Sequence, residues 1–82
     1  MSRDDFIQKV ENTYEMIIKI GNRRFTVCDE NEKGFSIAEW NMPETEQYYP
    51  DGKTLVEKYM IDKKNLIDYV DRIDIVDYTG FN

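Results

Sequence analysis

Residues 14–27 have the sequence YEMIIKIGNRRFTV, and this stretch decides the fold. Apolar and polar side chains alternate up to Ile20, and a period of two predicts a half-buried β-strand. Gly21 and Asn22 form a two-residue turn, in which glycine at the first position favours a type II′ hairpin. The predicted cross-strand pairs are Ile20 with Arg23, Ile18 with Phe25, and Met16 with Val27. The side chains predicted on the opposite face are those of Glu15, Lys19, Arg24 and Thr26.

A short helix is expected before this hairpin, over about residues 3–12. Ser2 and Asp5 have the spacing of an N-cap pair, and acidic side chains in a first turn favour the positive end of the helix dipole. The apolar residues at helical spacing, which should face the core, are Phe6, Ile7 and Val10.

A third strand is predicted after the hairpin. Residues 29–34 form a polar turn, and residues 35–40 alternate again, so that Phe35 and Ile37 continue the core face. Residues 41–53 contain both prolines of the chain and are expected to form a long loop.

The second half of the chain predicts two short helices. Thr54 to Glu57 has the pattern of a capping box, which indicates a helix of about two turns. Its predicted apolar face consists of Leu55, Val56, Tyr59 and Met60. Asp62 is expected to cap the second helix, whose inward residues are Leu66, Ile67 and Val70.

A final strand is predicted over residues 72–78, because this segment is rich in β-branched residues, and Gly80 should end it. A helix continuing to residue 76 is the alternative. The expected fold class is α+β in the order α-β-β-β-α-α-β, in which a three-stranded antiparallel meander follows an N-terminal helix, and two short helices and a C-terminal strand complete the chain.

The composition excludes several classes of site. A chain of 82 residues is expected to form one small domain, residues 1–82, with little room for an enclosed cavity. It has no histidine and one cysteine, which excludes a Ser/His or Cys/His nucleophile pair and an internal disulfide. We therefore expect no enzyme, no cofactor and no metal site. The absence of a signal-like or membrane-spanning run predicts a cytoplasmic protein without membrane contact.

Two local features resemble chemical sites but do not have the pattern required. Residues 29–34 begin like a calcium-binding EF-hand loop, yet Lys33 occupies a ligand position and Trp40 stands where a bidentate glutamate is needed. Cys28 shares a strand face with Arg24, whose guanidinium would lower a thiol pKa. Without a nearby base, a semi-buried structural thiol is the favoured interpretation.

Acidic residues concentrate in the later part of the sequence. Residues 1–28 carry five basic and four acidic side chains, whereas residues 29–82 carry six basic and thirteen acidic ones. One acidic group surrounds the third strand and the expected loop, at Asp29, Glu30, Glu32, Glu39, Glu44 and Glu46. A second group near the C-terminus consists of Asp68, Asp71, Asp74 and Asp77. Such a surface repels nucleic acid and attracts a basic partner, although charge of this size also serves solubility.

Aromatic and methionine side chains flank the first acidic group, and these types are enriched in protein interfaces. Covering the back of the sheet is the alternative role for them. The predicted partner-binding residues are Glu39, Trp40, Met42, Glu44, Glu46, Tyr48, Tyr49, Asp68, Asp71, Asp74 and Asp77.

The segment from Thr54 through Val70 to Ile73-Asp-Ile-Val76, less than half of the chain, is similar in rhythm to the C-terminal half of small acidic proteins of phages and mobile elements in Gram-positive bacteria. In size, acidity and lack of catalytic residues the chain also resembles the anti-CRISPR inhibitors. The resemblance implies a nuclease partner, such as a CRISPR effector, and no cofactor. No residue role is carried over.

The first functional hypothesis is a binding protein that occupies the basic, nucleic-acid-binding surface of a partner protein. Carboxylates would take the Lys and Arg sites that phosphates normally use, and the chain itself would bind no nucleic acid. It would be a monomer or a weak homodimer. The alternative is a self-associating structural or assembly protein. A catalytic domain would need a bound ligand or a second chain that completes a cleft.

Overall fold

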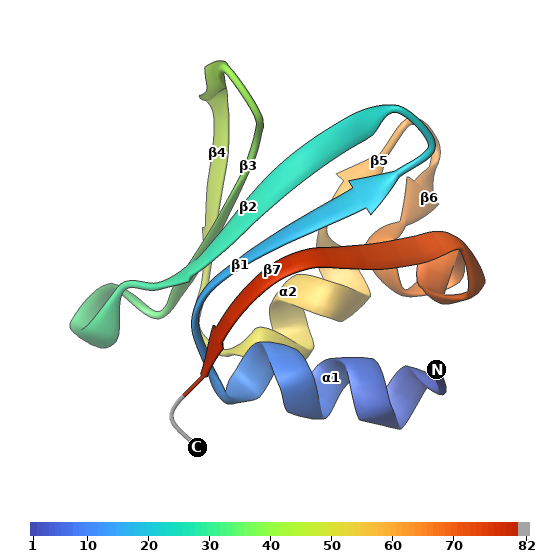
Figure 1. Cartoon of the computed structure of the whole chain (residues 1–82). Coiled ribbons are helices and arrows are strands. Elements are labelled where there is room, and N and C mark those ends of the chain that lie inside the picture. Colours follow the sequence, from blue (N-terminus) through green and yellow to red (C-terminus); the bar gives the residue numbers. More distant parts are fainter. Residues whose placement is uncertain (81–82) are drawn as a thin grey trace.

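The computed structural model describes residues 1–80 and contains two α-helices, two 3-10 helices and seven strands within that range (Figure 1). The helical elements are α1 (Arg3–Glu11), η1 (Asn31–Lys33), α2 (Gly52–Lys58) and η2 (Leu66–Arg72). The strands are β1 (Thr13–Ile20), β2 (Arg23–Asp29), β3 (Phe35–Glu39), β4 (Met42–Tyr49), β5 (Met60–Ile61), β6 (Lys64–Asn65) and β7 (Ile73–Gly80).

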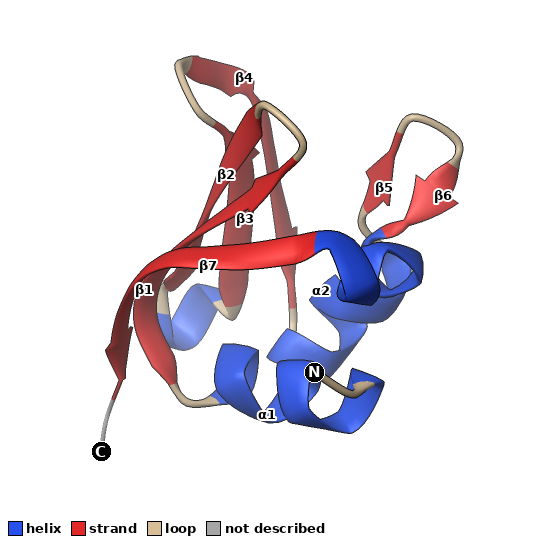
Figure 2. Cartoon of the chain, turned by 45° about the vertical axis from the view of Figure 1, so that its right-hand side comes forward, coloured by secondary structure: helices blue, strands red, loops and turns tan. Residues whose placement is uncertain are grey.

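Five strands form one antiparallel sheet in the order β4-β3-β2-β1-β7, so β4 and β7 are its edges. Helices α1 and α2 lie together on one side of this sheet, while β5 and β6 form a separate small hairpin (Figures 1 and 2). The expected α+β class is confirmed. The sheet is larger than the predicted meander because it contains β4 and β7 as well.

The predicted central hairpin is confirmed residue by residue. Ile20 pairs with Arg23, and the register continues through Ile18 with Phe25 and Met16 with Val27. Gly21 has a φ of +62° at the first turn position, as a type II′ turn requires. The predicted helix is also confirmed, since α1 begins after Ser2, whose hydroxyl accepts a hydrogen bond from the Asp5 amide in a capping box.

The prediction of a loop over residues 41–53 is wrong. Trp40 and Asn41 make a tight turn, with Asn41 at a φ of +61°, and β4 returns along β3. The pairing of Glu39 with Met42 jumps to Ile37 with Gln47, so β4 carries a bulge. Pro43 lies in this bulge, where its missing N–H costs no ladder hydrogen bond.

The two predicted helix caps are also wrong. The Asp51 carboxylate accepts a hydrogen bond from the Thr54 amide at 2.7 Å, so α2 begins at Gly52, before the expected capping box. Asp62 lies instead in the turn of the β5–β6 hairpin at a φ of +59°, and the next helix, η2, begins after Asn65.

Residues 73–80 form a strand, β7, and the helical alternative is wrong. β7 pairs antiparallel with β1, which places the last strand beside the first. The core lies between the sheet and the helices, where Phe6 and Val10 of α1 and Leu55 of α2 are fully buried. The sheet contributes Met16, Ile18, Phe25, Val27, Phe35, Ile37 and Ile73 to this core.

Candidate protein-binding face

The face of the sheet opposite α1 and α2, here the open face, carries no helix within residues 1–80 (Figure 2). Pairing registers arrange its side chains in rows across the strands. One row contains Thr79, Glu15, Cys28, Ser36 and Tyr48. The next contains Asp77, Ile17, Thr26 and Ala38. The third contains Asp74, Lys19 and Arg24, and Trp40 adjoins it through a 2.8 Å hydrogen bond from its amide to the Arg24 carbonyl.

One end of the open face is acidic. Glu15, Glu30 and Glu46, here the acidic cluster, lie around Cys28, and the Cys28 thiol is 4.0 Å from a Glu15 oxygen. Burial and these three carboxylates raise the pKa of the thiol, which is the reverse of the activation that Arg24 would produce. The thiol is half-buried, as the structural interpretation requires.

Tyr48 joins the acidic cluster at the edge of the sheet. Hydrogen bonding to the Glu46 carboxylate, burial and the charge of Glu30 raise the pKa of its phenol. Glu30 also accepts a 3.2 Å hydrogen bond from the buried Ser36 hydroxyl, which fixes that carboxylate over β3. The acidic cluster is therefore held in place by neighbours on three adjacent strands.

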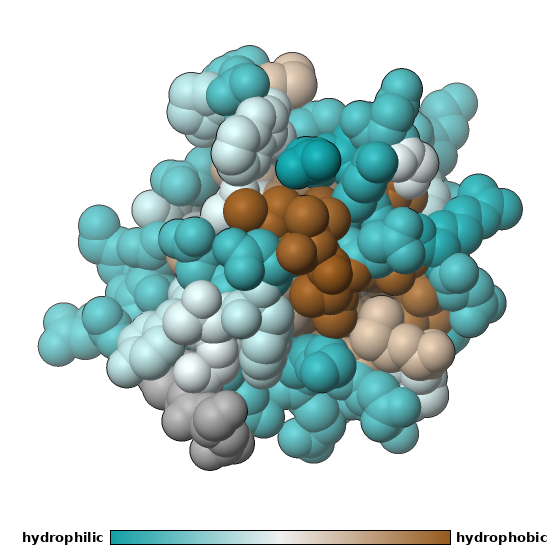
Figure 3. Space-filling model, viewed as in Figure 1, coloured by the Kyte–Doolittle hydropathy of each residue, from teal (hydrophilic) through white to brown (hydrophobic). Residues whose placement is uncertain are grey.

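The middle row of the open face is mixed, because Asp77 and Thr26 lie beside Ile17 and Ala38, and the far row carries two basic residues beside Asp74. Figure 3 shows a hydrophobic strip at the β7 edge of the sheet, bordered by hydrophilic side chains. Ile17 of β1 lies on the open face, whereas Ile20 and Ile75 pair with Ile73 and Ile18 and pack partly against the core on the helix side. Lys19 and Arg24 occupy the end opposite the acidic cluster.

The turn between β3 and β4 presents two large side chains to solvent. Trp40 is 50% exposed and Met42 is 41% exposed. Trp40 lines two shallow hollows, one of about 280 Å³ that it shares with Met42 and Glu46 of β4, and one of about 350 Å³ that it shares with Arg23 and Arg24 of β2. The Thr45 hydroxyl fixes the bulge below, because it accepts from the Glu39 amide at 2.8 Å and donates to the Met42 carbonyl at 2.7 Å.

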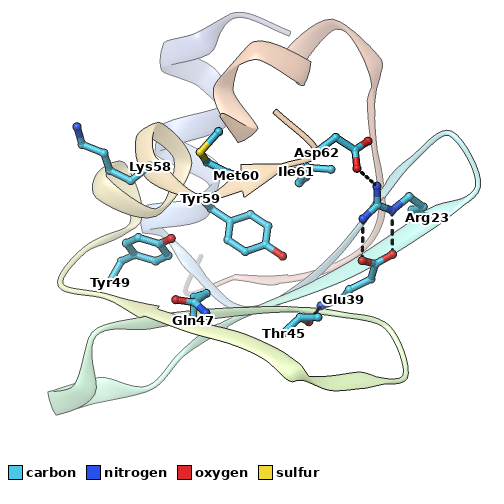
Figure 4. A pocket seen from close by; sticks show the side chains of 10 residues that line it. All are labelled: Arg23, Glu39, Thr45, Gln47, Tyr49, Lys58, Tyr59, Met60, Ile61 and Asp62. Carbon is cyan, nitrogen blue, oxygen red and sulfur yellow. Dashed lines mark hydrogen bonds and ion pairs between the residues drawn. The ribbon is translucent and has the colours of Figure 1, made fainter. Parts of the chain in front are cut away.

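A polar pocket of about 420 Å³ lies on the helix side, between β4 and the segment from Lys58 to Asp62 (Figure 4). Arg23 donates to both oxygens of Glu39, at 2.8 and 2.9 Å, and to Asp62 at 3.0 Å. This contact holds the pKa of Glu39 below its ordinary value. Both oxygens of the Glu39 carboxylate accept hydrogen bonds from Arg23, and the side chain is only 16% exposed. Glu39 is therefore not available for a partner.

Two tyrosines form the other wall of the pocket. Tyr59 follows α2 and points its hydroxyl into the pocket, beside Tyr49 from β4 (Figure 4). Burial raises the pKa of both phenols, and the charge of Glu39 adds to the effect on Tyr59. The predicted site residue Tyr49 therefore lies in the pocket and not on the open face.

The predicted site residues fall into separate regions. Glu46 and Tyr48 lie together on the open face, Trp40 and Met42 lie at its tip, and Glu44 is exposed in the bulge. Asp74 and Asp77 face the same side from β7. Asp68 and Asp71 lie elsewhere, on η2, where Asp68 is 3.7 Å from Arg3 at the start of α1.

The sequence reasoning did not select Glu15, Glu30, Lys19 or Arg24 as functional residues. Its hairpin register had already placed three of them on one face, but the absence of a covering helix was not encoded in any local pattern. Glu30 belongs to the first acidic group of the sequence but not to its predicted partner-binding residues, and its position over β3 depends on the hydrogen bond to Ser36.

Comparisons with family models, curated proteins and solved structures give no match. Among the described residues, no helix has the length and apolar character needed to cross a membrane.

Proposed function

We propose that this protein is a small, non-enzymatic binding protein that docks its open face on a basic, nucleic-acid-binding surface of a partner protein. The acidic cluster around Tyr48 is the observation that carries the proposal. Three carboxylates from different chain segments converge there, on the side of the sheet opposite α1 and α2, and one of them, Glu46, lines a shallow hollow together with Trp40 and Met42. A cluster of fixed negative charge attracts Lys and Arg side chains, whereas phosphates are repelled.

Occupation of a nucleic-acid-binding surface would make the protein an inhibitor of its partner. The spread of the carboxylates supports this role, because Glu15 lies on β1, Glu46 lies on β4, and Glu30 is held by Ser36 of β3 between them. A nuclease of a defence system, such as a CRISPR effector, is the kind of partner implied by the sequence resemblance. The basic residues Lys19 and Arg24 at the opposite end would orient the partner by repelling its positive charge.

Capture on the immobilised protein from a host lysate, followed by mass spectrometry, tests this proposal. The double variant Glu30→Lys/Glu46→Lys removes charge from the open face, and Asp68→Lys/Asp71→Lys makes the same charge change on η2. We expect a nucleic-acid-binding protein to be retained by the wild type and by the η2 variant, to be lost from the open-face variant, and to be displaced by salt or DNA. Equal retention by all three baits in high salt contradicts the proposal.

Self-association as a structural or assembly protein is the second candidate, favoured by the two sheet edges β4 and β7. Each copy would carry a net charge of −6, which opposes the contact. Sedimentation at several protein concentrations separates the candidates, because a strict monomer excludes this second function.

A further inference from the structure

The backbone of β4 offers hydrogen-bonding groups to a further strand. In an antiparallel pair, alternate residues direct both N–H and C=O groups toward the same neighbour. The Trp40 amide donates to the Arg24 carbonyl of β2, so alternation along β3 directs the backbone groups of Ile37 and Phe35 toward β4, where they pair with Gln47 and Tyr49. Tyr48 therefore directs its backbone N–H and C=O away from β3, at the outer edge of the sheet.

We propose that the partner contributes an extended segment that pairs with β4 as a sixth strand, with Lys or Arg side chains toward the open face and an uncharged side chain toward the pocket. This inference rests on the proposed function and specifies the part of the partner that is bound. Main-chain hydrogen bonds supply the contact in such β-augmentation, and alternating side chains supply its specificity.

The different surroundings on the two sides of β4 explain why basic and uncharged side chains should alternate along the bound segment. On the open face, side chains of an added strand would lie beside Tyr48 and Glu46, where basic groups meet the acidic cluster. On the helix side they would lie beside Gln47 and Tyr49, which line the pocket (Figure 4). The pocket contains Arg23 and Lys58 as well as two carboxylates, so its charges balance and an uncharged side chain is favoured there.

The occupant is a basic partner and not a second copy of this chain. Antiparallel pairing of two β4 strands would bring the Glu44 and Glu46 carboxylates of both copies to one interface, and like charges across strands destabilise pairing. The bulge and Pro43 protect the turn end of β4 from such pairing, which confines the added strand to the regular end around Gln47–Tyr49.

A synthetic peptide of four Lys-Val repeats, acetylated and amidated, is the probe for this inference. Binding to the isotope-labelled protein is followed by amide chemical shifts. A peptide N-methylated at each lysine is the control, because in an antiparallel pair the lysines opposite Tyr48 donate the ladder hydrogen bonds, and backbone methylation removes these donors but keeps the side-chain charge. We expect shifts centred on residues 46–49 and affinity at least about five-fold lower for the N-methylated peptide. Equal affinities, or no binding of either peptide, overturn the inference.

Two variants at one position isolate the backbone donor. Tyr48→Ala keeps the outward N–H, whereas Tyr48→Pro removes it, and proline is tolerated at an outward edge position. We expect peptide affinity to be about five-fold lower for Tyr48→Pro than for Tyr48→Ala, with both variants folded by circular dichroism. Equal affinity of two folded variants overturns the inference. A dimer in sedimentation whose amide shifts at residues 46–49 change with protein concentration also overturns it. Salt-sensitive capture of a basic protein would still support the proposed function. If Tyr48→Pro unfolds, the N-methylated peptide decides the question.

Discussion

Arg23 and Glu39 form a short, bidentate ion pair, with 2.8 Å between the closest nitrogen and oxygen. Both guanidinium bonds to Glu39 are shorter than 3.0 Å, and a third reaches Asp62. The contact joins β2 and β3 and reaches the β5–β6 hairpin, so one side chain positions three segments around the pocket. Geometry of this kind makes an arginine–carboxylate pair stronger than an ordinary surface ion pair.

Replacing Glu39 should make stability less dependent on pH. The pKa of Glu39 is lowered in the folded state, so its contribution is present above the ordinary value of 4.5 and is lost as pH falls through the lower folded value. At pH 7 we expect Glu39→Gln to reduce the free energy of unfolding by about 1–2 kcal/mol, and at pH 3 to reduce it less. Urea denaturation at both pH values measures this. A difference that does not change with pH contradicts the expectation, and the exposed Glu44→Gln should change stability by less than about 0.5 kcal/mol.

Gly34 should tolerate substitution less well than Gly21. Both have positive φ, but a Cβ at Gly34 would collide with the Tyr49 carbonyl oxygen, whereas a Cβ at Gly21 meets nothing within 4 Å. We expect Gly21→Ala to cost about 1 kcal/mol of unfolding free energy from backbone strain, and Gly34→Ala at least about 2 kcal/mol. Thermal unfolding of both variants provides the comparison. Equal losses of stability would show that the backbone at Tyr49 can move away from residue 34 at little energetic cost.

At the scale of elements, β4 is where sequence reasoning failed most. Its first half contains Pro43, and it shows little alternation because both of its faces are largely exposed, so a loop was the natural prediction. β4 is a strand because it pairs with β3. The left-handed conformation of Asn41 forms the turn between the two strands, and the Thr45 hydroxyl accepts a hydrogen bond from the Glu39 amide of β3. By contrast, the β1–β2 hairpin has a buried face and a specific turn, and its register could be predicted residue by residue.

The Thr45 hydroxyl should stabilise the bulge of β4. Thr45→Val removes one acceptor and one donor without changing the size of the side chain. We expect a loss of about 1 kcal/mol in the free energy of unfolding and faster hydrogen exchange of the Glu39 amide. Thr26→Val on the open face is the control, with an expected change below about 0.5 kcal/mol. Unchanged exchange at Glu39 would mean that the hydroxyl only fills space.

At the scale of the whole molecule, the fold depends on pairing between its first strand, β1, and its last strand, β7. β1 lies between β2 and β7, so the sheet cannot be completed until residues 73–80 are present. Ile73 is buried in the core, and Ile75 packs partly against it. Local patterns predict both strands, but the pairing of segments some 60 residues apart has no local signal, and that pairing creates the open face.

Removal of residues 73–82 should therefore unfold the protein. The truncated chain exposes one edge of β1 and loses the buried side chain of Ile73, and an 82-residue domain has little stability to spare. We expect circular dichroism to show no cooperative thermal transition. A cooperative transition in the truncated chain would show that the hairpins and helices form a core without β7.

The position of the single tryptophan has a practical consequence for spectroscopy. Trp40 lies in the β3–β4 turn, where it is half exposed, and it is not part of the buried core cluster. Its fluorescence should therefore change little when the core unfolds. A denaturation curve followed by fluorescence should show a smaller signal change than one followed by circular dichroism, with the same midpoint. For the same reason, a blue shift of its emission on mixing with another protein would report coverage of the turn, which gives the molecule a built-in optical probe of its candidate binding face.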